Sequence, residues 1–410
     1  MAQTQVPFGS VLAKKVYGAA VFAEMVRQPG LFTNMTGPAP GADEVRSKLE
    51  KMQTSPDYPI VRVSDLSKSA GASVSVDVFN ILQGKPVMGD TKLAGKMMSL
   101  TYASMDIKID QMRGGVDAGG RMTQQRTIHN LRGIGRAGLV GWWARASSQI
   151  KTIHLAGARG DENTPSWVVP LASDPDFTQI MVNTVRPPTI SRHFYPADAT
   201  SIATIEASDT LTIDELDRLR VRLDELETPM QSIKLPDDPG AHEGGIFLLL
   251  VSPRTWHHFE TVTTTNNAPS WRTFLMNARE RGSKNPLFTG ECGMWNGIVV
   301  RKMPYWVSFN TGTAVPVSAA ATDDTTTTST AAVPIHRCIL LGAQAMAEVW
   351  GQHHSSGTHF NWHEETTDHG NTFEASVAGM GGYDKLRFTD SSGNRYDHGV
   401  AVLDVSAPSI

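Results

Sequence analysis

The spacing of hydrophobic residues predicts one long helix over residues 123–156. No proline interrupts this stretch, and at 1.5 Å per residue the helix would be roughly 50 Å long. Few compact domains need a helix of that length, so we expect it to act as a strut. Its apolar positions recur near the 3.6-residue period of an amphipathic helix, and they are Ile128, Leu131, Leu139, Trp142, Trp143, Ala146, Ile150 and Ile153.

Alternating patterns predict a two-stranded arm before this helix. Every second residue of 74–78 is valine, and apolar residues alternate with charged ones over 105–110, which is the period-2 pattern of strands. Residues 83–96 between them are rich in glycine and lysine. A two-stranded ribbon alone is only marginally stable in water. The arm must therefore pack on its own domain or on another subunit, and the pattern leaves both open.

The second half of the chain mixes helix and strand patterns without an internal repeat, which predicts an α+β fold. Residues 212–215 form a capping box, with leucines at helical spacing to about residue 227. The apolar run 245–251 predicts a central strand. Further helices are expected over 10–28, 253–262 and 270–281, and further strands over 297–301, 336–341, 383–388 and 399–405, with a turn at 390–394.

Three stretches predict little regular structure. Residues 33–59 contain four prolines and are predicted to form an extended arm, and residues 157–208 form a proline-rich, irregular segment. Irregular segments of that length usually make contacts or carry function. Residues 310–334 are rich in threonine and alanine, which predicts an exposed loop.

Composition narrows the function classes. The 410 residues carry a net charge of -4 and only two cysteines, so no global basic field favours binding to phosphates. Two cysteines are too few for a disulfide framework, which favours a reducing compartment. We predict neither a signal peptide nor a membrane-spanning segment, because no run of 18 apolar residues occurs.

Two motifs could carry chemistry, and both are weak. Residues 133–138 spell G-x-G-x-x-G, but helix-periodic residues precede them and no acid follows, so close helix packing at these glycines is favoured over a dinucleotide site. Histidines gather near the C-terminus without the spacing of H-E-x-x-H. They are weak candidates for a metal site, and solvated or hydrogen-bonded side chains are favoured: His353, His354, His359, His363 and His369.

The order of these elements resembles the major capsid protein of tailed bacteriophages, the Hong Kong 97-type fold. Several short sequence segments are similar to those of one coat-protein family, from podovirus-like phages and related prophages. The residues that carry the resemblance are 77–80, 84–90, 109–113, 126–132, 342–345 and 383–388.

The resemblance implies a structural, non-enzymatic subunit without a cofactor. It also implies five regions: an N-terminal arm (1–70), an extended loop (71–113), the spine helix with part of a peripheral domain (114–210), an axial domain with the exposed loop 310–334 (211–350), and a return to peripheral strands (351–410). Pentamers and hexamers of the chain would build an icosahedral shell, assembled in the host bacterial cytoplasm, that encloses double-stranded DNA without specific binding. Further partners would be a portal protein and possible scaffolding or decoration proteins, with no membrane.

Charged and aromatic residues of the loop and spine are the expected contacts between subunits. They are Lys85, Asp90, Lys92, Lys96, Arg113, Arg126, Arg132, Trp142 and Trp143. Some relatives cross-link loop lysines covalently, but no partner acid and asparagine are marked here, so that chemistry is not carried over. Two alternatives stay open: a metal-dependent enzyme that uses residues 353–369, and a cellular nanocompartment shell of the same fold.

Overall fold

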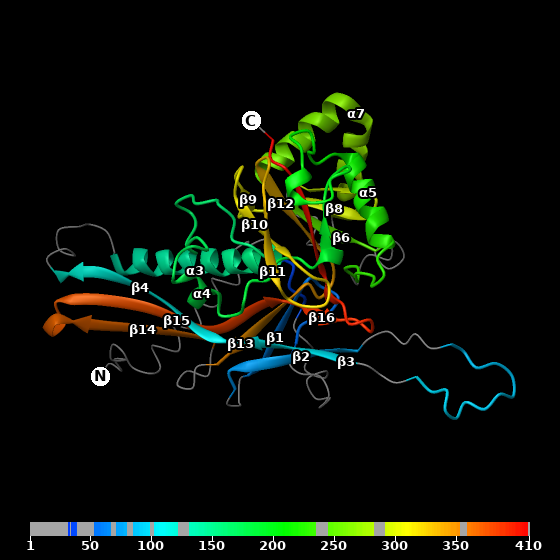
Figure 1. Cartoon of the computed structure of the whole chain (residues 1–410). Coiled ribbons are helices and arrows are strands. Elements are labelled where there is room, and N and C mark those ends of the chain that lie inside the picture. The colour runs from blue at the N-terminus through cyan, green and yellow to red at the C-terminus, as the bar shows by residue number, and fades with distance from the viewer. Residues whose placement is uncertain are drawn as a thin grey trace.

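The computed structural model of the protein describes residues 32, 34–38, 53–66, 71–79, 85–98, 102–121, 131–234, 245–282, 292–352 and 359–408. The described residues form an α+β fold with a five-stranded sheet, a seven-stranded sheet and three two-stranded ones. The two large sheets lie in different parts of the molecule, and one hairpin projects away from both (Figure 1).

The seven-stranded sheet has a fully apolar centre, as the run 245–251 predicted. Its central strand, β6 (Phe247–Val251), lies between two others and is buried along its length. The remaining strands are β5 (His193–Phe194), β7 (Cys292–Trp295), β8 (Ile298–Lys302), β9 (Val307–Phe309), β12 (Ile335–Leu341) and β18 (Val400–Ser406). Each face of β6 supports a separate hydrophobic core, because Leu248 and Leu250 pack in one cluster and Leu249 packs in the other.

Two helices pack near this sheet. In α5 (Ile213–Asp224), the Thr212 side chain accepts a hydrogen bond from the Glu215 backbone N–H, which confirms the predicted N-cap. The carboxylate of Glu215 accepts from Ala197 N and Arg218 instead of closing the capping box.

The second helix, α7 (Pro253–Gly282), is one continuous element containing Pro269, where two separate helices were predicted. It must bend, because the rings of Trp256 and Trp271 lie 6.0 Å apart, whereas fifteen residues of straight helix span about 22 Å. The two predicted segments are the two arms of this bent helix, and aromatic packing between the arms holds them together. A proline within a helix is a common cause of such a bend.

The five-stranded sheet is built around one long strand, β15 (Thr372–Lys385). Its neighbours are β4 (Asp110–Gly120), β13 (Met346–Gly351) and β14 (Phe360–Thr367), and β1 (Ile60–Leu66) completes the sheet by pairing in parallel with β13. Strand β1 corrects the predicted N-terminal arm, because part of region 1–70 is a sheet strand. Met35 and Tyr58 are also buried in a large core cluster, so the described parts of the segment 33–59 contribute to the folded body.

The predicted strut is present as α3 (Leu131–Ala156), which lies along β4 and β15 (Figure 1). Residues 123–130 of the prediction, and the helix predicted over 10–28, lie outside the described residues. Glycines in the strands allow the close packing. A Cβ on Gly114 would lie 2.5 Å from the Trp142 ring, and a Cβ on Gly379 would lie 2.7 Å from the Trp143 ring.

The glycines of α3 itself only partly match the expected close approach. A Cβ on Gly135 would meet Val116 at 2.9 Å, but no described atom comes within 4 Å of such a Cβ on Gly138 or Gly141. Among the described residues, the expected close approach is therefore not found at Gly138. The G-x-G-x-x-G run is helical throughout, so it lacks the turn that a dinucleotide site requires.

Two other predictions need correction. Residues 310–334 contain a hairpin of β10 (Ala314–Ser318) and β11 (Thr326–Thr330), in which Val315 is fully buried. Alternating valines and β-branched threonines favour strands even in a polar segment. Region 351–410 is divided between the sheets, because β14 and β15 belong to the five-stranded sheet and β18 pairs with β12 in the seven-stranded one. Between them, β16 (Arg387–Thr389) and β17 (Arg395–Asp397) flank the predicted turn at 390–394.

Candidate interaction surface

The predicted two-stranded arm is confirmed as a hairpin of β2 (Ser73–Phe79) and β3 (Tyr102–Lys108). The strands pair antiparallel, with Val74 opposite Ile107 and Val76 opposite Met105. Val74, Met105 and Ile107 are buried in a core shared with β1 and β13. The base of the hairpin is therefore fixed to its own chain, as an ordinary hairpin would be.

The far end of the hairpin is different. Residues 85–98, called the tip below, are exposed except for half-buried Val87, and Figure 1 shows this segment projecting from the body. The predicted contact residues of the loop all lie on it and are exposed: Lys85, Asp90, Lys92 and Lys96.

Apolar side chains are also concentrated on the tip. Met88 is 77% exposed, Leu93 is 56% exposed and Met97 is 76% exposed. Exposed apolar side chains that gather in one place usually mark an interaction site. Only charged residues of this segment were predicted to be contacts, although its methionines, Met88, Met97 and Met98, are also visible in the sequence.

The predicted contact residues outside the tip do not form one surface. Arg113 on β4 is exposed, whereas the Arg132 guanidinium forms an ion pair with Glu364 of β14. Trp142 is half-buried, and Trp143 is 4% exposed within a core that includes Phe360. Trp143 therefore packs in a core of its own chain. Arg126 lies outside the described residues.

The described histidines of the stretch 353–369 lie in different environments. His359 binds the Gly351 carbonyl oxygen through Nδ1 at 2.7 Å, and His363 on β14 lies 3.5 Å from Glu365. His369 is exposed, and His353 and His354 lie outside the described residues. Within the part of the chain that the structure describes, no three His, Cys, Asp or Glu side chains gather as metal ligands would.

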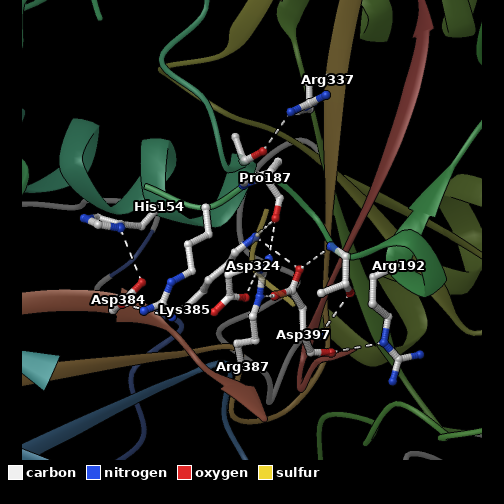
Figure 2. A network of polar contacts seen from close by, with 12 residues as sticks. His154, Pro187, Arg192, Asp324, Arg337, Asp384, Lys385, Arg387 and Asp397 are labelled. Atoms are coloured by element: carbon white, nitrogen blue, oxygen red, sulfur yellow. Dashed lines mark hydrogen bonds and ion pairs between the residues drawn. The ribbon is translucent and has the colours of Figure 1, made fainter. Parts of the chain in front are cut away.

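A buried polar network joins the two large sheets, and Asp397 lies at its centre (Figure 2). Lys385 Nζ and Arg387 Nε donate to the Asp397 carboxylate at 3.1 and 2.8 Å. The backbone N–H of Thr189 donates to the same carboxylate at 3.1 Å, and Arg192 Nε donates to the Asp397 carbonyl oxygen at 3.0 Å. Lys385 ends β15, while Thr189 and Arg192 lead into β5, so the network fixes one sheet against the other.

The electrostatics of Asp397 explain why a charge is tolerated there. Burial alone would raise the pKa of this carboxyl group, but the charges of Lys385 and Arg387 and their hydrogen bonds outweigh it and lower the pKa to about 2. Arg387 also pairs with Asp324, between β10 and β11, at 3.0 Å. The network therefore holds the β10–β11 hairpin as well.

Two similar groups of ion pairs, each around a buried carboxylate, support the body. Glu348 of β13 binds Lys151 of α3 at 2.9 Å and Arg62 of β1 at 3.0 Å. Burial raises the pKa of Glu348, but these two cations outweigh it and lower the pKa to about 2. In the seven-stranded sheet, Arg337 binds Asp404 through two hydrogen bonds of 2.8 and 2.7 Å.

Buried histidines make the fold sensitive to acid, and we expect stability to fall between pH 6.5 and pH 4. Burial, followed by a neighbouring arginine, lowers the pKa of both His336 and His398 from 6.5 to about 4. Between these pH values the unfolded chain binds protons that the folded chain excludes, so the free energy of unfolding decreases as pH falls. The shift corresponds to about 3 kcal/mol per histidine.

Thermal unfolding measured from pH 7.5 to pH 4.5 tests this expectation. The His398→Phe variant removes one titrating group and should show a smaller loss of Tm over this range than the unchanged chain. Equal losses in both proteins would show that His398 does not contribute.

No helix among the described residues is long and apolar enough to cross a membrane. The described residues combine a body of two large sheets, linked by a buried polar network, with one exposed tip that carries apolar side chains and lysines. These features suit binding to another macromolecule better than catalysis.

Comparisons with known proteins give consistent similarities. A family model described as phage capsid protein matches residues 5–409. The chain is 25% identical over 359 residues to the major capsid protein of Pseudomonas phage KPP25, covering 85% of this chain and 87% of that protein. The solved capsid of Ralstonia phage GP4 is similar with 26% identity and a TM-score of 0.68, covering 87% of this chain and 89% of that one. The cyanophage Pam1 capsid shares the fold with 18% identity and a TM-score of 0.58, covering 87% and 90%.

Proposed function

This chain belongs to the family of phage capsid proteins, and we propose that its copies join into the shell of a phage head chiefly through the tip of the β2–β3 hairpin. The chain is a structural subunit of the virion, and copies of it are the main partners. Its α+β fold is that of the Hong Kong 97-type capsid proteins. The way in which the copies meet is the part proposed here.

The exposure of the tip carries the proposal. Met88, Leu93 and Met97 are more than half exposed, although burying each such side chain would stabilise a complex by about 1.5–3 kcal/mol. The lysines beside them keep the free subunit soluble and offer ion pairs to a neighbour. The base of the hairpin, from which the tip projects, is packed on its own chain.

The two sheets suit two roles in a shell. The seven-stranded sheet with α5 and α7 is our candidate for the axial domain, where five or six copies would meet around a symmetry axis. The five-stranded sheet with α3 is our candidate for the peripheral domain. The Asp397 network would then fix the angle between the domains, and that angle affects the curvature of a shell.

The charge of the chain suits a container for DNA. A net charge of -4 provides little attraction for phosphates, and each phosphate contact adds affinity that would hinder the entry of the genome. We expect double-stranded DNA to be enclosed without specific binding. A portal protein at one vertex, and scaffolding or decoration proteins, would be further partners during assembly in the host bacterial cytoplasm.

Proteolysis tests whether the tip becomes covered. In the free chain we expect trypsin to cut rapidly after Lys92 and Lys96, because both are exposed. In purified particles the same two cuts should be about tenfold slower or more, because cleavage requires the tip to leave its site. Denatured particles serve as the control for full cleavage. Equal rates in free chains and intact particles would refute the role of the tip.

A further inference from the structure

A cavity lies between helix α3, strands β4 and β15, and the short helix α4 (Phe177–Met181). Its volume is about 540 Å³, which is within the range of pockets that bind small molecules. The segment 379–383 of β15 lines it, and three of these five residues are glycine, so little side-chain volume stands over this backbone. Apolar side chains form much of the remaining lining, and they include Met112, Trp142, Trp143, Ile150, Ile180 and Phe360.

The aromatic side chains of the lining favour a flat ring as the ligand. The rings of Trp142 and Trp143 meet edge to face with their centroids 6.0 Å apart, and those of Trp143 and Phe360 do so at 5.3 Å. A further ring that enters the cavity can make the same offset and edge-to-face contacts. An aromatic ligand therefore fits this lining better than a flexible aliphatic chain does.

Trp143 adds a buried polar group that lacks a partner. It is 4% exposed, and its Nε1–H has no hydrogen-bond acceptor among the described residues. The ring edge that carries Nε1 lies beside Gly379, because Cζ2 on that edge would be 2.7 Å from a Cβ on this glycine. Gly379 itself lines the cavity. An indole N–H can donate to the π-face of an aromatic ring, so a ring bound beside Gly379 supplies an acceptor.

A carboxylate stands at the mouth of the cavity. Successive side chains of a strand point to opposite faces, and Gly114 of β4 faces the ring of Trp142. Asp110 and Met112 therefore lie on the α3 face of the same strand. Asp110 is exposed and lines the cavity. Its carboxylate accepts a hydrogen bond from the backbone N–H of Gln111 at 2.7 Å, and it forms no ion pair with a described residue.

The other titratable groups of the lining do not oppose a cation beside Asp110. Arg113 also lines the cavity, but the alternation of β4 directs its side chain to the other face. Burial lowers the pKa of His359 below its ordinary value of 6.5, so this ring is uncharged at pH 7. Burial raises the pKa of Tyr383, so its hydroxyl is uncharged as well. A ligand carboxylate would instead lie beside the like charge of Asp110.

We propose that this cavity binds a flat aromatic molecule that carries a protonated amine. The rings lie against Trp142 and Met112, with one ring face toward Nε1–H of Trp143, and the ammonium group lies at Asp110. The assignment goes beyond the proposed function and does not depend on how copies of the chain meet. Its test therefore uses the full chain at a dilution at which it is unassembled.

Three probes with the same ring system test the assignment: naphthylmethylamine, naphthylmethanol and naphthoate. They are cationic, neutral and anionic at pH 7, and isothermal titration calorimetry measures the Kd of each. We expect the amine to bind with a Kd of about 1 mM or lower. It should bind about threefold tighter than the alcohol, as an exposed ion pair allows, and the acid should bind more weakly than the alcohol.

Two variants locate the site. Asp110→Asn should bind the amine and the alcohol equally, whereas Asp198→Asn, at an exposed aspartate outside the cavity, should keep the preference for the amine. Ala146 of α3 lines the cavity, so Ala146→Leu reduces its volume and should weaken the binding of all three probes about tenfold. Thermal unfolding checks the fold of each variant.

Equal binding of the amine and the alcohol by the unchanged chain, or tightest binding of the acid, would overturn the inference. Undiminished binding by Ala146→Leu at an unchanged Tm would do the same, as would the absence of binding by any of the three probes. If Ala146→Leu unfolds, Asp110→Asn decides alone, because a retained preference for the amine contradicts the site. None of these results bears on shell formation, so the proposed function is tested separately.

Discussion

Replacement of residues 85–98 by a short glycine-serine linker should abolish particle formation and leave the chain folded. The replaced side chains are exposed apart from half-buried Val87, so the body loses little packing. Each shell contact loses Met88, Leu93 and Met97, and the burial of three such side chains changes the required subunit concentration by at least about 100-fold. Light scattering and electron microscopy measure particles, and circular dichroism with thermal unfolding measures the fold.

Smaller changes separate side-chain chemistry from loop length. Met88→Ser combined with Met97→Ser should weaken assembly strongly, whereas Met276→Ser, on an exposed part of α7, should have little effect. Normal shells from the linker variant would show that assembly does not require the tip. A linker variant with a much lower Tm would instead show that the tip stabilises its own chain.

Asp397→Ala should lower the free energy of unfolding by about 3–5 kcal/mol, because it leaves Lys385 and Arg387 as buried charges without their shared partner. Both side chains are about 1% exposed, so water cannot replace the carboxylate. The substitution also removes the central residue of the polar network that links the two large sheets. Urea unfolding at pH 7, followed by fluorescence, measures the change.

A matched control uses an aspartate without these contacts. Asp198 is exposed, and Asp198→Ala should change the free energy of unfolding by less than about 0.5 kcal/mol. The low pKa of Asp397 adds a dependence on acid. Its contribution is complete above the ordinary pKa of 3.8 and is lost as pH falls through about 2. A loss below about 1 kcal/mol for Asp397→Ala at pH 7 would contradict the central place of this residue.

Much of the fold was predictable because its strongest patterns are local. The strut, the arm and the central strand β6 each show a clear period or a continuous apolar run. Strand β4 was missed, because its sequence DQMRGGVDAGG is rich in glycine and charge. Tertiary packing explains a glycine in this strand, since Gly114 leaves space for the ring of Trp142 from α3. The sequence pattern of one element does not show where that element must be small to make room for side chains of a distant element.

The candidate site was predicted only in part, for the same reason. The tip lysines followed from a flexible segment between two strands. An apolar cavity is lined by residues of α3, β4, β14 and β15, among others, and these residues come together only in the folded chain. Asp397 resembles an ordinary turn residue in the sequence, and its role depends on Lys385 and on Thr189, which lies 208 residues away. Trp143 was assigned to an interface because sequence alone does not separate a core tryptophan from a contact tryptophan.

Electron microscopy of the unsubstituted chain expressed alone is the decisive test of self-assembly through the tip. Light scattering at moderate salt accompanies the images. We predict closed particles, or rings of five and six copies, in which the tip of one copy is covered by a neighbouring copy. Particles whose tips extend freely into solvent, without contact to a neighbouring copy, would contradict it.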